Sequence, residues 1–361
     1  MSAFTETDAL SGVKAIGAPE KAGSMQLLEI ERHSPKDFDV VIDVKFCGIC
    51  RTDVHFIDGD MGVDSWPMIP GHEIAGIVRW AGKDTEYKKG DRVGVGCLVD
   101  SCMECAPCQS GTEQYCTTGP TFTYASPSKY GRACPTGEDT KGGYSKLMVV
   151  HSRFVAPVPD ELALEKAGPI LCAGVTVYDP FVHWKAGSDG VKNVGVVGGG
   201  GVGMMGIKIA KALGCEVTAV TRSTTKVDDL KRAGADKVLV STDEESMKEA
   251  AGSLDLILDT VPAEHPIEGE VGLLARDGRL VVLGIQRTEL AALPFVLGRK
   301  CVAGSFIGGM PATKEVLLFC AKHDILPDTE LVRADKVNDV YKTLREGTAG
   351  LKRYVIDIGN M

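Results

Sequence analysis

A thiol, an imidazole and a carboxylate that could bind a metal ion lie within residues 47–76: Cys50, His72 and Glu73. Zinc accepts thiolate, imidazole and carboxylate ligands, and a catalytic zinc has three protein ligands and one open position. This stretch supplies at most part of such a set, so a further ligand must come from elsewhere in the chain. Cys47 and Cys50 also form a C-x-x-C pair, for which a redox dithiol is the alternative, although the pair lacks a thioredoxin-like βαβ setting.

Four further cysteines have the spacing C-x2-C-x2-C-x7-C: Cys102, Cys105, Cys108 and Cys116. Four thiolates form a closed tetrahedral zinc site with no position for water, which is typical of a structural metal. An iron–sulfur cluster is the main alternative, because some ferredoxins also use closely spaced cysteines. No Lys or Arg lies between Cys97 and Cys116, which argues against a zinc finger that binds nucleic acid.

A glycine-rich turn follows in residues 194–206, VGVVGGGGVGMMG, where Gly198, Gly200 and Gly203 fit G-x-G-x-x-G. The glycines allow a tight turn, close approach of the backbone to a pyrophosphate and close helix–sheet packing. Gly201 and Val202 lie at the N-terminus of the expected helix, which offers its free N–H groups to the phosphates. The pattern predicts a dinucleotide-binding loop, and a glycine-rich turn without a ligand is the alternative.

The next expected strand indicates which dinucleotide binds. An acidic residue about 20 positions after the loop would bind the ribose 2′-hydroxyl of NAD. This strand ends instead in Thr221, Arg222 and Ser223, with Lys226 shortly after. Two cations and several hydroxyls suit a 2′-phosphate, so the sequence predicts NADP(H), and a solvated turn is the alternative for each residue.

The elements that position these groups fall into two kinds. The first half is turn-dense and antiparallel in character, and later strands alternate with helices, which predicts a doubly wound parallel sheet. The expected strands are 38–43, 74–80, 90–96, 146–150, 193–197, 216–221, 237–240, 254–259, 279–284 and 354–358. The expected helices are 202–213, 225–234, 244–252, 267–275 and 313–322.

Composition and charge restrict the partners. The chain has 361 residues, too many for one ordinary core, so two domains are expected. The net charge of −9 disfavours nucleic acid and anionic membranes. No apolar run reaches the roughly 20 residues that span a bilayer, and the N-terminus lacks the pattern of a signal peptide. We expect a cytoplasmic protein whose 12 cysteines are metal ligands and buried thiols.

The motifs CGICRTD, PGHEIAG, GVGCLVDSCMECAPCQSGTEQYC, PILCAGVTVY and GGGGVG, in this order, resemble those of the zinc-dependent medium-chain alcohol dehydrogenases. The cinnamyl alcohol dehydrogenase group is the branch most similar to this chain, and the resemblance covers nearly its whole length. It implies an α/β protein with a GroES-like, mostly antiparallel β catalytic domain at residues 1–171, which includes a structural zinc lobe at 97–116. A Rossmann NADP-binding domain would follow at 172–306, and residues 307–361 would return to the catalytic domain.

The same resemblance assigns a catalytic zinc to Cys50, His72 and Cys172, with Glu73 as an alternating or outer ligand. Taken alone, Cys172 would be interpreted as a core cysteine. Asp53 matches an acid that orients a zinc ligand.

The resemblance also implies a proton relay through Thr52 and His55, with Asp60 supporting the histidine. His55 and His72 are the only two of the seven histidines with a place in this scheme. Arg51, where many relatives have His or Ser, would lie near the cofactor phosphates, and Thr176 near the nicotinamide. Phe122 or Tyr124 would take the position of a bulky aromatic residue in relatives.

We therefore expect an NADP(H)-dependent zinc alcohol dehydrogenase with two Zn²⁺ per chain, acting on a primary alcohol or aldehyde. The alternatives are a metal-independent quinone or enoyl reductase of the same fold and a non-enzymatic zinc-binding protein. A homodimer is expected, because family members commonly pair edge strands near residues 280–310.

Overall fold

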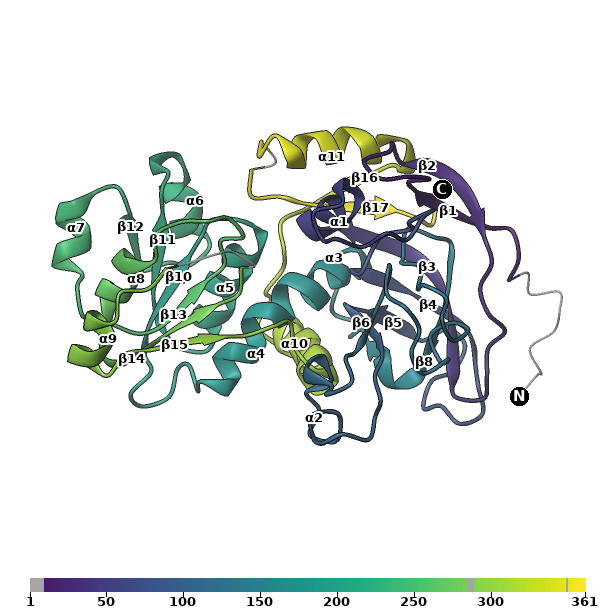
Figure 1. Ribbon diagram of the computed structural model, residues 1–361, viewed down its shortest axis with the longest axis horizontal. Helices are drawn as coiled ribbons and strands as arrows, with labels where there is room; N and C mark the ends of the chain where they lie inside the picture. The colour runs from purple at the N-terminus through teal and green to yellow at the C-terminus, as the bar shows by residue number, and fades with distance from the viewer. Residues whose placement is uncertain (1–9, 285–288, 349) are drawn as a thin grey trace. The chain divides into compact units, whose positions relative to one another are not determined.

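The structure is a computed structural model that describes residues 10–284, 289–348 and 350–361. The chain forms two compact units (Figure 1). Unit 1 contains the chain up to Cys172 together with Gly308–Lys322 and Leu326–Met361, and unit 2 contains Ala173–Ile307 and His323–Ile325. The N-terminal stretch on which we based the absence of a signal peptide lies partly outside the described residues. No helix in the described part is long and apolar enough to cross a membrane.

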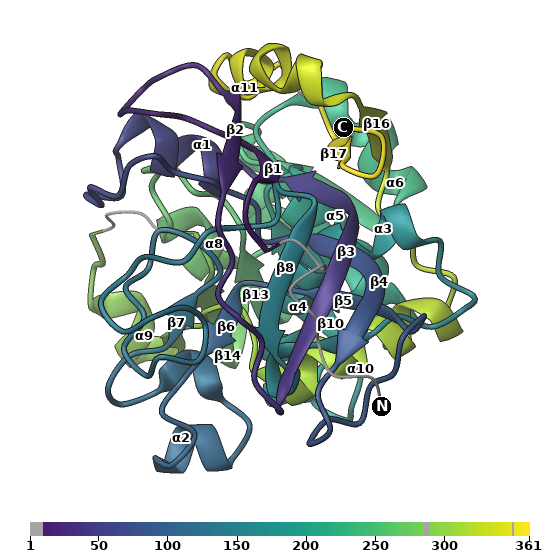
Figure 2. The same cartoon turned by 90° about the vertical axis from the view of Figure 1, so that its right-hand side faces the viewer.

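Unit 1 is built on a seven-stranded sheet of order β16-β17-β3-β4-β5-β9, in which β8 also pairs with β3. Figure 2 shows β8, β3 and β4 side by side. The pairings in this sheet are antiparallel, except that of β16 with β17, which is parallel. The strands are β3 (Asp39–Ile49), β4 (Ile74–Ala81), β5 (Arg92–Val95), β8 (Leu147–His151), β9 (Ala156–Pro157), β16 (Thr329–Val332) and β17 (Arg353–Asp357). Two small antiparallel pairs complete the unit: β1 (Val13–Gly17) with β2 (Gln26–Ile30), and β6 (Leu98–Asp100) with β7 (Thr121–Phe122). The expected antiparallel β character of this part is confirmed.

The helices of unit 1 are short and lie at the sheet's ends and connections. They are α1 (Arg51–Asp58), α2 (Ala106–Gln109), α3 (Leu164–Pro169), α10 (Met310–Lys322) and α11 (Val337–Arg345). The central strand β3 is buried along most of its length, with Val40, Val41 and Ile42 fully inaccessible. This apolar run is buried on both faces of the sheet, as expected for a central strand.

Unit 2 contains the predicted doubly wound sheet, with strand order β12-β11-β10-β13-β14-β15 and every pairing parallel. In chain order this is 3-2-1-4-5-6, the order of dinucleotide-binding sheets. The strands are β10 (Asn193–Val197), β11 (Glu216–Thr221), β12 (Lys237–Val240), β13 (Leu254–Asp259), β14 (Leu274–Val282) and β15 (Cys301–Gly304). The helices are α4 (Val175–His183), α5 (Gly201–Ala212), α6 (Val227–Arg232), α7 (Glu244–Glu249), α8 (Glu268–Leu273) and α9 (Leu293–Gly298).

Four strands of unit 2, β10 to β13, have the predicted bounds. The main differences are β14, which starts five residues before the expected strand at 279, and β3, which continues six residues past Asp43 to Ile49. Cys47 is therefore a strand residue, and Cys50 directly precedes helix α1.

Candidate active site and metal centres

Cys50 lies where β3 passes into α1, as the N-cap residue of that helix. Its backbone N–H donates to the Oδ2 atom of Asp53 at 2.8 Å, so this carboxylate stabilises the first turn of α1. Helix N-termini favour negative charge, because their free N–H groups carry a partial positive charge. The start of α1 is thus a suitable position for a thiolate.

Asp53 also connects the CGICRTD motif to the PGHEIAG motif. Its carboxylate is completely buried and accepts hydrogen bonds from Gly71 N at 3.2 Å and from the hydroxyl of Tyr144 at 3.1 Å. Its Oδ1 atom lies 3.2 Å from Nδ1 of His72. A carboxylate on one ring nitrogen directs the other nitrogen toward a metal and increases its basicity. Asp53 therefore orients His72, as the resemblance implies.

Cys172 lies in a π-helical turn, Ile170–Gly174, between α3 and α4. Such turns insert an extra residue into a helix and are frequent at functional sites. The Sγ atom of Cys172 is 4.0 Å from Sγ of Cys50 and 3.3 Å from Nε2 of His72. In a tetrahedral zinc site, bond lengths near 2.3 Å to sulfur and 2.0 Å to nitrogen separate these donors by about 3.6 to 3.8 Å. Residues 122 positions apart are thus brought to the spacing that zinc requires.

Glu73 completes a group of four buried donors, Cys50, His72, Glu73 and Cys172, whose ligand atoms all lie within 4.8 Å of one another. Its Oε1 atom accepts a hydrogen bond from the guanidinium of Arg353, while its Oε2 atom is buried without a partner. Burial raises the pKa of Glu73 to about 7 against the lowering effect of Arg353. A buried oxygen without a partner is costly unless a cation or a proton satisfies it. The donor set and this oxygen both fit a zinc ion.

Two glycines leave the space that Glu73 occupies. A Cβ atom on Gly48 would lie 2.0 Å from Oε2 of Glu73, and one on Gly168 would lie 2.3 Å from its carbonyl oxygen. Any larger side chain at either position would displace Glu73 from the metal site.

Sequence reasoning missed two residues at this site, Arg353 and Cys97. Arg353 opens β17 and pairs with a carboxylate 280 residues away, so no local spacing predicts it. A hydrogen bond with Cys172 lowers the pKa of the Cys97 thiol. Tyr124 stacks on His72 with ring centroids 5.9 Å apart. Of the two aromatic candidates, Tyr124 thus lies at the zinc site, while Phe122 belongs to β7.

The four-cysteine lobe has the geometry of a second metal centre. The sulfur atoms of Cys102 and Cys108 are 3.8 Å apart, those of Cys105 and Cys116 are 4.0 Å apart, and all four lie within 4.8 Å of one another. The backbone N–H of Thr117 and others that point at Cys105 lower the pKa of its thiol to about 7. Four thiolates at this spacing fit zinc in a closed site.

The lobe is attached to the rest of unit 1 through Glu113. This buried carboxylate accepts hydrogen bonds from the N–H of Met310 at 2.9 Å and from Arg153 at 3.1 Å. The contact holds the lobe against the start of α10.

In unit 2 the glycine-rich loop connects β10 to α5. Gly198 has φ +100°, in the left-handed region that favours glycine, and Gly200 is the N-cap of α5. A Cβ atom on Gly203 would lie 1.8 Å from the carbonyl oxygen of Gly198, so only glycine allows the helix to pack this close. Gly201 and Val202 form the first turn of α5 and present their N–H groups at its N-terminus.

The residues expected to select NADP lie together after β11. The hydroxyl of Thr221 accepts the N–H of Ser223 at 3.2 Å, and Nζ of Lys226 donates to the carbonyl of Gly199 at 3.3 Å. Arg222 is exposed. Lys226 thus links this turn to the glycine-rich loop.

The relay residues lie on α1 and just beyond it. The Oγ1 atom of Thr52 is 3.5 Å from Sγ of Cys50. Nδ1 of His55 is 2.7 Å from Oδ2 of Asp60, and both side chains are exposed to solvent. Arg51 is exposed and donates to the carbonyl of Leu344.

Thr176 stands apart from these residues in sequence, half-buried in α4 of unit 2. The structure assigns it to a helix that directly follows the π-helical turn of Cys172.

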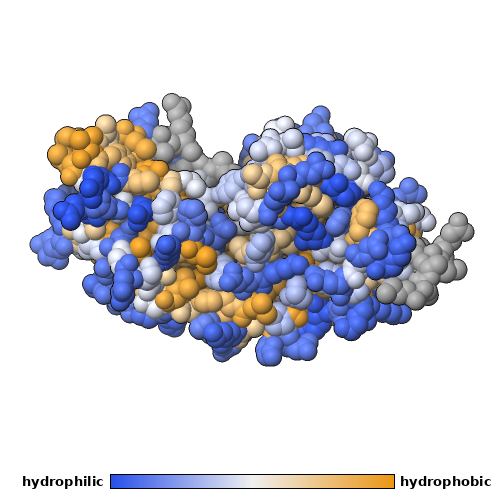
Figure 3. Space-filling view, turned by 90° about the horizontal axis from the view of Figure 1, so that it is seen from below, coloured by the Kyte–Doolittle hydropathy of each residue, from blue (hydrophilic) through white to orange (hydrophobic). Residues whose placement is uncertain are grey.

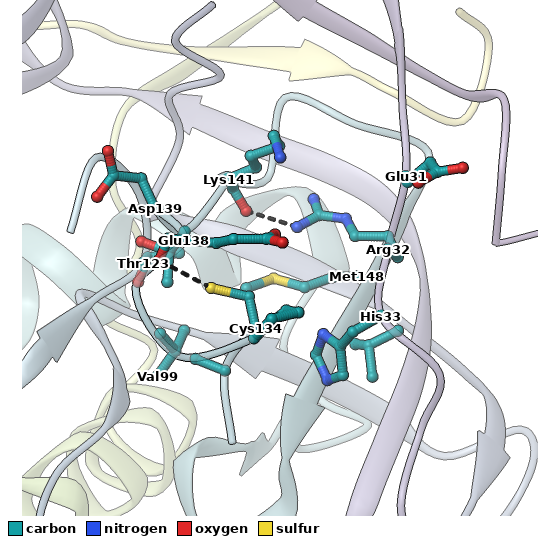
Figure 4. A pocket seen from close by; sticks show the side chains of 14 residues that line it. Glu31, Arg32, His33, Val99, Thr123, Cys134, Glu138, Asp139, Lys141 and Met148 are labelled. Atoms are coloured by element: carbon teal, nitrogen blue, oxygen red, sulfur yellow. Dashed lines mark hydrogen bonds between the residues drawn. The ribbon is translucent and has the colours of Figure 1, made fainter. Parts of the chain in front are cut away.

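Figure 4 shows a separate pocket of unit 1, with a volume of about 190 Å³. The guanidinium of Arg32 donates to the carbonyls of Leu147, Lys141 and Gly142 at 2.9, 2.6 and 2.8 Å. Arg32 therefore connects neighbouring chain segments. None of the predicted catalytic, cofactor or metal residues lines this pocket.

Comparisons with known proteins agree with this geometry. A family model described as an alcohol dehydrogenase GroES-like domain matches residues 36–160, and one described as a zinc-binding dehydrogenase matches residues 201–322. The NADP-dependent alcohol dehydrogenase C of Mycobacterium bovis is 42% identical over 352 residues, covering 97% of this chain and 99% of the relative. Cinnamyl alcohol dehydrogenase 1 of Ocimum basilicum is 42% identical over 351 residues and covers 96% of both chains.

Solved structures give the same result. A cinnamyl alcohol dehydrogenase from Sorghum bicolor superposes with a TM-score of 0.91 at 40% identity, covering 96% of this chain and 98% of that chain. The CAD of Helicobacter pylori, solved with NADP(H), has a TM-score of 0.87 at 35% identity, with coverage of 96% and 98%.

Proposed function

This chain belongs to the zinc-binding alcohol dehydrogenase family, and we propose that it acts as an NADP(H)-dependent alcohol dehydrogenase and aldehyde reductase. It interconverts a primary alcohol and its aldehyde by hydride transfer. The observation that carries this proposal is the convergence of Cys50, His72 and Cys172 within unit 1. Unit 2 of the same chain contains a dinucleotide-type loop. A metal-independent reductase would have no use for the metal-binding group. A non-enzymatic zinc protein would have no use for the dinucleotide-type loop.

A zinc ion bound by Cys50, His72 and Cys172 would supply Lewis-acid polarisation of the substrate oxygen. The chain's own residues prepare the site. Asp53 holds His72 in the orientation in which Nε2 faces the two thiols. Tyr124 covers one face of the imidazole and restricts access of water.

NADPH would supply the hydride, and the chain supplies the proton route. We assign Thr52 to the hydrogen bond with the substrate oxygen, because its hydroxyl lies beside Cys50. His55 then exchanges the proton with solvent, since it is held by Asp60 at 2.7 Å and is exposed. Histidine is the side chain most often used as a general acid or base in such proton transfers.

We assign cofactor binding to the loop residues Gly198, Gly200, Gly201, Val202 and Gly203, and 2′-phosphate selection to Thr221, Arg222, Ser223 and Lys226. Arg51 and Thr176 are proposed as further contacts with the phosphates and the nicotinamide. By the same reasoning, residues 1–171 and 307–361 form the catalytic domain and residues 172–306 the NADP domain.

We also propose a homodimer in the cytoplasm. Four apolar side chains around α9 are exposed, with exposed fractions of 46% for Leu290, 64% for Leu293, 73% for Val296 and 77% for Leu297. Figure 3 shows apolar residues gathered at the left of the face that it draws. An apolar surface next to the edge strand β15 is the kind of feature that a second copy covers.

The test is a panel of aromatic, aliphatic and terpenoid aldehydes assayed with NADPH, together with metal analysis. We expect turnover with at least one class and two zinc ions per chain. Cys50→Ser should abolish turnover and remove one zinc while the fold survives. Absence of zinc from the active wild-type protein would contradict the proposal and favour the metal-independent reductase.

A further inference from the structure

Unit 2 contains a third group of metal-ligating side chains, which the proposed reaction does not use. Asp259 ends β13, His265 lies in the following connection, and Glu270 lies in α8. One ligand atom of each lies within 4.8 Å of the others. Asp259 is fully buried and Glu270 is 5% exposed, so this is not an ordinary cluster of solvated surface acids.

The histidine of this cluster presents a defined nitrogen to the two carboxylates. Nδ1 of His265 is 2.9 Å from the carbonyl oxygen of Ala263, which requires Nδ1 to carry the proton. Nε2 is 3.0 Å from Oε1 of Glu270 and 3.5 Å from Oδ2 of Asp259. Metal-binding histidines commonly donate their other N–H to a backbone carbonyl in this manner.

These distances fit a common metal ion. With bonds of about 2.0 to 2.1 Å to nitrogen and oxygen, ligands around a tetrahedral ion are about 3.4 Å apart. The observed 3.0 and 3.5 Å lie on either side of that value. A set of one imidazole and two carboxylates is of mixed hardness, and it suits Zn²⁺ or Mn²⁺ better than a soft ion.

One carboxylate oxygen of this cluster has no partner. Oε2 of Glu270 is buried, and it has no hydrogen-bond partner among the described residues. A buried carboxylate oxygen without a partner is costly unless a cation or a proton satisfies it. Together with the spacing of the three ligand atoms, this oxygen favours a cation at the cluster.

We propose that Asp259, His265 and Glu270 form a third metal site, which binds one divalent transition-metal ion and has a structural role in unit 2. A divalent ion cancels the two carboxylate charges and gives a partner to the free oxygen. The ion would link the end of β13 to α8 across the connection that contains His265.

The position of the site suggests what the ion stabilises. Thr260, the residue after Asp259, donates from its backbone N and from Oγ1 to the carbonyl of Val197, at 3.0 and 2.7 Å. Val197 is the last residue of β10, directly before the glycine-rich loop. An ion that fixes the end of β13 therefore also supports the start of the dinucleotide loop.

The experiment measures metal content rather than activity. Wild-type holoenzyme is incubated with excess Mn²⁺, freed of unbound ion, and analysed for total zinc and manganese per chain. Mn²⁺ is the probe because it prefers oxygen and nitrogen ligands and leaves thiolate-bound zinc in place. We expect three metal ions per chain, of which two are zinc in the cysteine-containing sites.

Variants locate the third ion. His265→Asn and Glu270→Gln should each bind two metals in total, whereas Glu268→Gln, an acidic residue in the same helix that is exposed, should bind three. A count of two in the wild type overturns the proposal, and so does a third ion that both variants retain. If the variants do not fold, pulsed electron paramagnetic resonance of Mn²⁺ in the wild type decides. Coupling to one imidazole nitrogen is expected, and its absence overturns the proposal.

This outcome is independent of the proposed reaction. Loss of the aldehyde reductase activity with an intact third ion would contradict the proposed function alone. Two metals in an active enzyme would contradict the third site alone, and would leave the cluster as a proton-linked ion-pair network around His265.

Discussion

Replacing Gly203 by Ala tests whether the β10–α5 turn is the cofactor site and how tightly it is built. The added Cβ atom would lie 1.8 Å from the carbonyl oxygen of Gly198, where about 3.3 Å is an ordinary C···O contact. The turn must therefore open by about 1.5 Å. Because the obstacle is backbone instead of a flexible side chain, it cannot rotate away.

The cost follows from this displacement. Overpacking of a closely packed position costs about 1 to 3 kcal/mol, and a backbone clash belongs at the upper end. A loss of about 3 kcal/mol lowers the melting temperature of a domain of this size by about 6 to 12 °C. A displaced loop also loses its aligned N–H groups, so we expect the Kd for NADPH to rise by about 100-fold, which corresponds to about 2.7 kcal/mol.

Gly200→Ala is the matched control. Gly200 has φ −98°, which any residue adopts, and a Cβ atom there meets nothing within 4 Å. The variant should keep the wild-type melting temperature and yet bind NADPH more weakly, because its methyl group occupies the N-terminus of α5. Both are measured by thermal unfolding and by fluorescence titration of NADPH, with zinc content as a check on unit 1. The reasoning is refuted if Gly203→Ala melts and binds like the wild type.

Four further changes test other parts of the molecule. Arg222→Asp should raise the KM for NADPH by at least about tenfold and that for NADH far less; equal effects would contradict the NADP assignment. Cys105→Ser should lower soluble yield and remove one zinc, because structural zinc contributes directly to folding, and a normal yield would argue against that role. Burial lowers the pKa of His151 from 6.5 to about 4, so between these two pH values the folded protein binds fewer protons than the unfolded chain. The free energy of unfolding should therefore fall by about 2 kcal/mol as the pH drops from 6.5 to 4, a value already reduced because the side chain is partly exposed. His151→Asn should remove this loss, and curves of stability against pH that run parallel for the two proteins would contradict the prediction. Arg353→Met should cost about 3 to 5 kcal/mol by leaving a buried carboxylate without its cation, and adding Glu73→Gln should restore most of that stability in urea unfolding; no recovery would mean that Arg353 acts through packing.

The parallel sheet could be predicted from the sequence because its signals are local. Each of the strands β10 to β13 is a short apolar run, bounded by polar or glycine residues and followed by a helical pattern. Short apolar runs that alternate with helices are typical of the strands of a parallel sheet covered by helices on both faces. The strand β15 (Cys301–Gly304) was not expected, since its four residues are partly or fully exposed and have no such contrast.

The course of β3 could not be predicted, and the reason is a contact across the fold. Gly48 interrupts the apolar pattern, and glycine within an expected strand normally indicates a turn or a bulge. The structure gives another cause, because a Cβ atom on Gly48 would collide with Glu73. Gly48 is therefore glycine because of a contact with a residue elsewhere in the fold, and its residue type does not indicate its own secondary structure.

The two metal sites also differ in how far the sequence alone could predict them. The four-cysteine lobe is contained in 15 residues, so its spacing alone predicts a common centre. Cys50, His72 and Cys172 are distributed over more than 100 residues, and only the resemblance to a family joined them before the structure placed them within 4.8 Å. Neither the spacing nor the family resemblance predicted Arg353 and Cys97, since neither residue is part of a spacing pattern.

The charges around the proposed catalytic zinc explain why Arg353 belongs to this site. Two thiolates, Cys50 and Cys172, neutralise one divalent ion, and His72 adds no charge when Asp53 holds it as a neutral ligand. Glu73 would then bring one uncompensated negative charge into a buried site, which is unfavourable at low dielectric. Arg353 cancels that charge through the guanidinium contact on Oε1, and Oε2 remains directed into the group of donors. A bound divalent ion together with its two thiolates would be neutral, and the Glu73–Arg353 pair is neutral, so the residues that hold the ion would add no net charge to the buried site.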